Sequence, residues 1–184
     1  MRKLISLAMI ASFLSVSACN KTEAPKVETA FKPTATIQEL MQSVIDPHVD
    51  AIWNAVQTVV STEGTQEIRP QSDEDWAVLK NHAITLREVS NLLIIEGRKV
   101  AVEGASTSIH SSELAPQQIE KLIAEQRPAF IKNAHDLHDA VTIALSAIEE
   151  KNVDKLEAAG GVIEHACEQC HSQFWYPGDK RPSE

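Results

Sequence analysis

The sequence has few of the residues that β-rich folds use most. Aromatic residues make up only 4% of the 184 residues, and there are just 6 glycines. Strands favour aromatic side chains, and the tight turns between strands favour glycine, so this composition argues against a β-sandwich. Ala, Leu, Ile, Glu and Gln are common instead, and most of these favour helices. The composition therefore predicts an all-α fold, and at this length one domain with a proper core.

The sequence also has fewer basic residues than acidic ones. Lys and Arg number 17 against 26 Asp and Glu, which gives a net charge of -9. Loss of Arg2 and Lys3 with an N-terminal leader would leave 15 basic residues against 26 acidic ones, a charge of -11. Such a chain is unsuited to nucleic acid, and an acidic surface favours a partner with a basic surface.

The N-terminus has the order of an export signal. Arg2 and Lys3 precede a short apolar run over residues 4–16, which ends in the small residues Ser17 and Ala18. The run is too short to span a membrane. Cys19 follows, and Val-Ser-Ala-Cys resembles the lipobox of bacterial lipoproteins, which implies lipidation of Cys19. The alternative is an ordinary secretory signal cleaved near a cysteine. We expect a signal peptide over 1–18 and a flexible tether over 19–35.

The strongest motif lies near the C-terminus. Cys167 and Cys170 are three residues apart, and His171 follows the second cysteine directly. This spacing is typical of c-type haem attachment, in which each thiol binds one vinyl group and the imidazole becomes an axial ligand of the iron. On a helix the three side chains share one face. The motif predicts one covalent haem c per chain.

Three other interpretations of the two cysteines remain open. A Cys-x-x-Cys redox pair usually accompanies a βαβ pattern, which this sequence lacks. A structural zinc site needs a second pair of ligands, and the remaining cysteine, Cys19, is already assigned to the lipid. A chance pair of buried cysteines is the third interpretation. Export agrees best with haem, because c-type haem is attached outside the cytoplasm.

Apolar residues recur at helical spacing through most of the chain. The last of these stripes is the most regular and contains both thiols, with Gly160 leaving room for close backbone approach. We expect no strand, and polar loops over 61–71 and 105–115. The stripes and end signals predict four helices: from Thr34 or Thr36 to Val59 with a kink at Pro47, from Ser72 past Gly97 to Gly104, from Pro116 to Ile148 with a kink at Pro128, and from Asn152 to Pro177.

Four helices with short connections predict an antiparallel up-down-up-down four-helix bundle over 36–177, followed by a tail over 178–184. This bundle, with Cys-x-x-Cys-His late in its last helix, resembles the cytochrome c′ family. The resemblance implies haem c inside the bundle with His171 as the proximal ligand. It also implies a distal side that is either ligated by methionine or open to small gases.

Met41 is the methionine that remains once the leader is removed, and it lies early in the first helix. In an antiparallel arrangement that position is level with the end of the last helix, where His171 lies. His48 is seven residues further along, roughly 10 Å. We therefore expect Met41 as the sixth ligand, with core packing as the alternative role.

Other residues are given lesser roles. His110, in a loop at the same end, is kept as an alternative ligand. The remaining histidines are expected to be ordinary core or surface residues: His82, His135, His138 and His165. Three tryptophans are expected to be packing residues: Trp53, Trp76 and Trp175. Three basic residues are candidates to contact a haem propionate: Arg87, Arg98 and Lys99.

The expected function is one-electron transfer by a periplasmic cytochrome that is lipid-anchored to a bacterial membrane, not an enzyme. The alternative is a five-coordinate haem protein that binds or senses NO or CO. A haem-free bundle with a redox-active thiol pair is a third class. The expected partners are a redox protein with a basic surface, the membrane through the N-terminal lipid, and a second copy in a homodimer.

Overall fold

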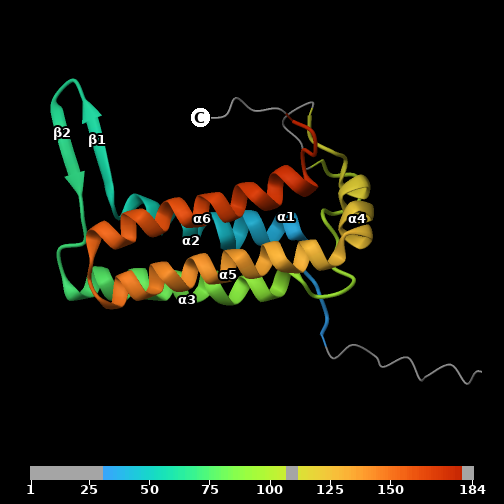
Figure 1. Cartoon of the computed structure of the whole chain (residues 1–184), viewed down its shortest axis with the longest axis horizontal. Coiled ribbons are helices and arrows are strands. Elements are labelled where there is room, and N and C mark those ends of the chain that lie inside the picture. Colours follow the sequence, from blue (N-terminus) through green and yellow to red (C-terminus); the bar gives the residue numbers. More distant parts are fainter. Residues whose placement is uncertain (1–30, 107–111, 180–184) are drawn as a thin grey trace, which may run out of the picture. The chain divides into compact units, whose positions relative to one another are not determined.

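The computed structural model describes residues 31–106 and 112–179, and this part of the chain is predominantly helical (Figure 1). None of its helices is both long and apolar enough to cross a bilayer. Its elements in chain order are α1 (Ile37–Leu40), a π-helix η1 (Met41–Ile45), α2 (Asp46–Asn54), β1 (Gln57–Ser61), β2 (Gly64–Ile68), α3 (Asp73–Leu93), α4 (Pro116–Glu125), α5 (Arg127–Glu149) and α6 (Val153–Phe174).

The first helical stretch runs from α1 through η1 into α2. Thr36 caps it by accepting a hydrogen bond from the Glu39 N–H, and the Glu39 carboxylate accepts one from the Thr36 N–H. The kink predicted at Pro47 takes the form of the π-helix that precedes it. Pro47 has no N–H to continue the regular pattern, and the Asp46 N–H bonds to the Met41 carbonyl five residues earlier. A single π turn of this kind is frequent at functional sites.

The expectation of an all-α fold is wrong at residues 57–68. The first helix ends at Asn54 instead of reaching Val59, and β1 then pairs with β2 in an antiparallel hairpin. Valine and threonine recur along this segment, and these β-branched side chains favour strands. Gly64, with φ +131°, takes a conformation at the turn that other residues rarely adopt. Figure 1 shows the hairpin projecting away from the helices.

Helix α3 begins as predicted, since Ser72 and Asp75 form a reciprocal capping box. It ends at Leu93, however, and its predicted continuation to Gly104 is wrong. Gly97 and Gly104 both have φ +80°, which is incompatible with a right-handed helix. The segment instead runs beside the start of α1. The Ile37 N–H donates to the Lys99 carbonyl at 2.8 Å, and the Gln38 N–H donates to Val100 at 2.9 Å.

The predicted third helix is two helices, α4 and α5. They meet at Gln126, whose φ of -115° and ψ of 35° lie outside the helical range. Pro128 occupies the first turn of α5, where its missing N–H costs no hydrogen bond. The kink predicted at Pro128 is therefore confirmed as a complete break.

Helix α6 carries the regular apolar stripe on its buried side. Asn152 caps it by accepting a hydrogen bond from the Lys155 N–H at 2.9 Å. Leu156 and Ile163 are fully buried, and Phe174 meets Phe130 of α5 edge to face, with ring centroids 5.4 Å apart. Helix α5 packs along both α3 and α6, and α2 contacts the same two helices from the other side (Figure 1). The core thus lies between the α1–η1–α2 stretch and the three long helices.

One contact between α2 and α3 gives a testable pH dependence. The rings of His48 and His82 lie 5.0 Å apart, and the His48 Nδ1 is 2.7 Å from the Val44 carbonyl. Burial, followed by the charge of His48, lowers the pKa of His82 below its ordinary 6.5. The unfolded chain therefore binds a proton at His82 more readily than the folded chain, so protonation favours unfolding.

We expect the thermal midpoint to fall as the pH drops through about 6.5. His82→Gln should flatten this dependence, because it removes the group whose pKa differs between the two states. His135→Gln, at an exposed position on α5, is the control and should leave the slope unchanged. Thermal unfolding monitored by circular dichroism between pH 5 and 8 measures both. A His82→Gln slope equal to that of the wild type would show that the pair does not control stability.

Candidate functional site

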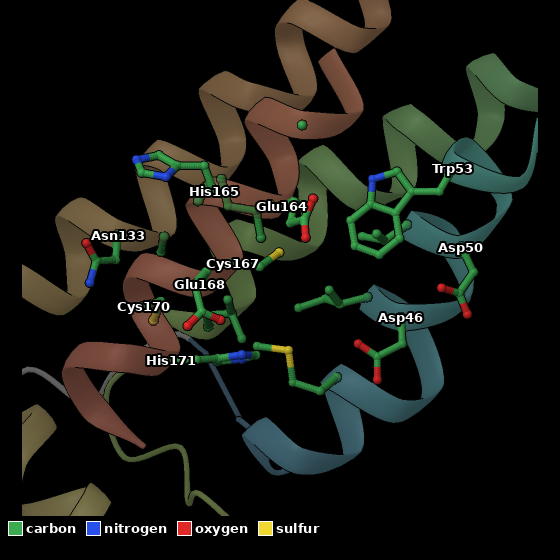
Figure 2. A pocket seen from close by; sticks show the side chains of 18 of the residues that line it. Asp46, Asp50, Trp53, Asn133, Glu164, His165, Cys167, Glu168, Cys170 and His171 are labelled. Atoms are coloured by element: carbon green, nitrogen blue, oxygen red, sulfur yellow. The ribbon is translucent and has the colours of Figure 1, made fainter. Parts of the chain in front are cut away.

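A cavity of about 900 Å³ lies between the α1–η1–α2 stretch and helices α5 and α6 (Figure 2). Its volume is within the range of roughly 300–1,000 Å³ that is usual for small-molecule and cofactor sites. Much of its wall is apolar. The apolar wall residues are Ile45, Val49, Leu93, Phe130, Ala134, Leu137 and Ala166.

The three residues of the C-terminal motif all line this cavity. Cys167, Cys170 and His171 come from successive turns of α6, as their spacing predicted. Both thiols are partly buried and free of disulfide bonds. Burial raises the pKa of Cys167 to about 11, with Asp46 and Glu164 adding to the shift. Burial also raises the pKa of Cys170 to about 12.

These high thiol pKa values bear on the alternative interpretations of the motif. Reactive redox cysteines and zinc ligands act as thiolates, and redox sites lower the thiol pKa with nearby positive charge. The surroundings of Cys167 are negative instead, so both thiols are protonated at neutral pH. This environment disfavours a redox-active thiol pair.

A chain of amides lies behind Cys170 and holds α5 against α6. Asn133 is buried, with 6% of its surface exposed, and it hydrogen-bonds to the Cys170 thiol. Its Nδ2 also donates to Gln173 Oε1 at 2.9 Å, and Gln173 Nε2 donates to Gln126 Oε1 at 2.9 Å. These contacts fix the last turns of α6 and therefore the positions of the motif side chains.

His171 lies among aromatic residues at the end of α6. Its ring centroid is 5.5 Å from that of Trp175 and 6.4 Å from that of Tyr176. The backbone N–H groups of both residues donate to the His171 carbonyl, at 2.8 and 3.1 Å. The Tyr176 hydroxyl in turn donates to Glu168 Oε2 at 2.8 Å. The imidazole therefore projects into the cavity from a helix end held by several contacts (Figure 2).

The facing wall comes from η1 and α2. Met41, in the π-helix, lines the same cavity as His171. Asp46, Asp50 and Trp53 follow at spacings of four and three, so they share one helical face. Burial and then the neighbouring Asp50 raise the pKa of Asp46, and His171 partly offsets this shift. The two walls are thus close enough for their charges to interact.

Acidic residues outnumber basic ones around the cavity. Among the described residues, no Lys or Arg lines it. Four carboxylates do: Asp46, Asp50, Glu164 and Glu168. The three residues considered for a haem propionate bond elsewhere. Arg98 donates to the Leu92 and Ala35 carbonyls, Lys99 pairs with Glu120 at 3.1 Å, and the Arg87 Nε lies 3.8 Å from Glu88. A propionate at this cavity would therefore be satisfied by solvent or by uncharged groups.

The other predicted residues are only partly brought together. His165 lines the cavity, although its position on the helix suggested otherwise, and its Nε2 lies 2.9 Å from Gln169 Nε2. His48 is not among the lining residues, in agreement with its lower ranking. Cys19 and His110 lie outside the described residues.

The acidic residues and Trp53 were not predicted as parts of the site. Trp53 was expected to be a packing residue, and it keeps 36% of its surface exposed. A signal for them exists in the spacing. Glu164, Glu168 and His171 recur every three to four residues on α6, as Asp46, Asp50 and Trp53 do on α2. Such periodic polar positions beside an apolar stripe indicate the edge of a buried face.

The residues that line the cavity fit a covalently bound haem. Two protonated thiols and an imidazole reach one mainly apolar cavity from a single helix, and a thioether sulfur lies in its facing wall. In residues 31–106 and 112–179 there is no group of three or more His, Cys, Asp or Glu side chains arranged to hold a metal ion by themselves. No protein-family model, curated protein or solved structure matches the chain.

Proposed function

We propose that the protein is a c-type cytochrome that transfers single electrons. Cys167 and Cys170 hold one haem c per chain through thioether bonds, His171 is its proximal ligand, and Met41 is its sixth ligand. Haem c supplies one-electron exchange at its iron when bound. The observation that carries the proposal is that all four side chains line one cavity of about 900 Å³.

The surrounding residues suit this role. Much of the cavity wall is apolar, and the backbone N–H groups of Trp175 and Tyr176 hold the end of α6 that carries His171. A histidine and a methionine on two packed helices hold their ligand atoms with little freedom, which limits rearrangement between oxidation states. No paired-carboxylate or nucleophile–base site was recognised in the sequence, and we propose a carrier, not an enzyme.

For the fold we propose an antiparallel up-down-up-down four-helix bundle in which α1, η1 and α2 together form the first helix. Helices α3, α5 and α6 then form the other three. Two sets of contacts support this arrangement: α5 contacts α3 and α6, and α2 also contacts α3 and α6. Helix α4 and the β-hairpin are additions outside the bundle. The domain limits at 36 and 177 remain predictions, with Thr36 capping α1 and α6 ending at Phe174.

Absorption spectra of the oxidised and reduced protein test the proposed function. A c-type spectrum with a low-spin ferric state would support Met41 ligation and electron transfer. A high-spin ferric state with rapid CO binding would favour the alternative, a five-coordinate haem protein that binds or senses small gases such as NO or CO. A preparation from haem-competent cells with no haem absorption would contradict both.

We also propose that the protein is exported, lipidated at Cys19 and held on a periplasmic membrane surface. A single acyl chain binds a membrane only marginally, whereas the several chains of a bacterial lipoprotein attach it stably. We expect Cys19→Ser to move the protein out of the membrane fraction or to leave its leader uncleaved. Fractionation and intact-mass analysis measure this. A mature N-terminus other than Cys19 would rule lipidation out. A homodimer remains a proposal that sedimentation would test.

A further inference from the structure

A smaller hollow of about 230 Å³ lies beside the main cavity. Its wall combines an indole, two carboxylates, one valine and the bare backbone of two glycines. Trp53, Gly161 and Glu164 line both hollows and therefore form the boundary between them. The remaining residues of the smaller hollow are Val56, Glu157 and Gly160.

The indole of Trp53 is held in place although much of it is exposed. Its Nε1 donates to the Gly160 carbonyl at 3.1 Å. A Cβ at position 160 would lie 3.1 Å from Trp53 Cδ1, so glycine allows the ring to approach the α6 backbone this closely. Trp53 keeps 36% of its surface exposed and lines the hollow, where its indole is available to a ligand. Figure 2 shows Trp53 and Glu164 at the same edge of the main cavity.

The carboxylates of the hollow are poorly neutralised. Glu157 and Glu164 are two helical turns apart, so they lie on one face of α6 on either side of the two glycines. Glu157 is 4.0 Å from Arg69, whose guanidinium also bonds to the Gln57 and Ile68 carbonyls. Glu164 has no ion pair among the described residues, whereas Lys80, Lys99, Lys151 and Lys155 are each paired with an acid.

We infer that this hollow binds a lysine or arginine side chain from a basic partner protein. A cation over an indole face gains a cation–π attraction, and two carboxylates at the edges add ion pairs. The alkyl stem of the same side chain can lie on Val56 and the glycine backbone. The net charge of -9 attracts a basic protein from a distance.

The position of the hollow adds a consequence for electron transfer. Because Trp53 and Glu164 also line the main cavity, a partner anchored there lies next to the proposed haem. That the partner is a redox protein rests on the proposed function. The binding of a basic side chain does not, since the hollow is built from residues outside the haem motif.

The test is titration of the full-length haem-loaded protein with a hexalysine peptide. Calorimetry at low ionic strength gives the affinity, and the Trp53 indole N–H resonance of the reduced protein reports the location, with Trp53→Leu identifying that signal. We expect the Glu157→Gln/Glu164→Gln double variant to bind about tenfold more weakly, since each exposed ion pair contributes up to about fivefold. Binding should also weaken as salt rises.

The matched control is the Glu96→Gln/Glu103→Gln double variant. It removes the same charge from exposed positions in the segment after α3, which pairs with the start of α1 and not with Trp53. We expect it to change the affinity less than twofold. Equal losses of affinity in the two double variants would show that only net charge matters and would overturn the inference. A Trp53 signal that does not change when hexalysine is added would also overturn it.

Spectra of the same samples separate the inference from the proposed function. Protein that lacks haem but binds hexalysine through the hollow would contradict the proposed function and leave the hollow intact. A c-type spectrum together with equal binding by the two double variants would support the proposed function and contradict the inference about the hollow. A hexaglutamate peptide should not bind, and binding by it would count against recognition by charge.

Discussion

Wild-type protein made with c-type maturation machinery is expected to keep its haem through denaturing electrophoresis, and Cys167→Ala/Cys170→Ala is expected to lose it completely. Thioether bonds survive unfolding, whereas axial ligands do not. Each single Cys→Ala variant leaves one bond and should retain a reduced amount of haem. In-gel haem staining and intact mass measure the loss. The effect should be the largest of any substitution, because the proposed covalent attachment depends on these two thiols alone.

Gln169→Ala is the matched control for this experiment. It changes one of the two residues between the thiols, keeps their spacing, and removes only an exposed side chain that contacts His165. It should retain haem at the wild-type level. Circular dichroism of the double variant separates lost attachment from lost folding. If the wild-type polypeptide is free of haem after denaturation, covalent attachment is wrong and with it the centre of the proposed function.

The parts of the fold that sequence predicted well are those controlled locally. Thr36, Ser72 and Asn152 each accept a hydrogen bond from an N–H three residues later, and this needs only the neighbouring backbone. Pro47 and Pro128 act on their own turn of helix in the same way. Helix starts and irregularities could therefore be read from short stretches of chain.

The errors arise where distant contacts or competing preferences decide. Residues 55–59 continue the apolar period of a helix, but the β-branched residues on both sides of Gly64 favour a hairpin: Thr58, Val59 and Val60 before it, and Thr65 and Ile68 after it. This hairpin pairs residues up to eleven positions apart. The segment after Leu93 follows the backbone of α1 instead of continuing its helix. Neither partner could be inferred from the segment itself.

The candidate site divides in the same way. Cys167, Cys170 and His171 were predicted because attachment chemistry fixes their spacing along the chain. The facing wall was not predicted beyond Met41, since Asp46 and Trp53 reach the cavity only through the packing of α2 against α6. The acidic character of the whole chain was visible in its composition, but its concentration around the cavity was not.

Met41→Ala is expected to convert a low-spin haem into a high-spin, five-coordinate one that binds carbon monoxide readily. If the Met41 sulfur is the sixth ligand, its loss removes a near-infrared sulfur-to-iron band and lowers the reduction potential, since methionine ligation raises it. Stability should fall too. A fully buried methionine truncated to alanine costs about 2–5 kcal/mol, and because Met41 is only partly buried we expect about 2 kcal/mol from packing, plus the lost iron bond.

Two control variants separate ligation from packing. Met41→Leu conserves volume and should cost less than about 1.5 kcal/mol in packing, yet it removes the sulfur and should give the same spectral change as alanine. Leu40→Ala removes a buried side chain from the preceding position, which does not line the cavity, and should lower stability with an unchanged spectrum. Wild-type protein that is already high-spin and binds carbon monoxide quickly would exclude Met41 as a ligand. The same cavity would then be open on its distal side, and the gas-binding alternative would replace electron transfer as the proposed function.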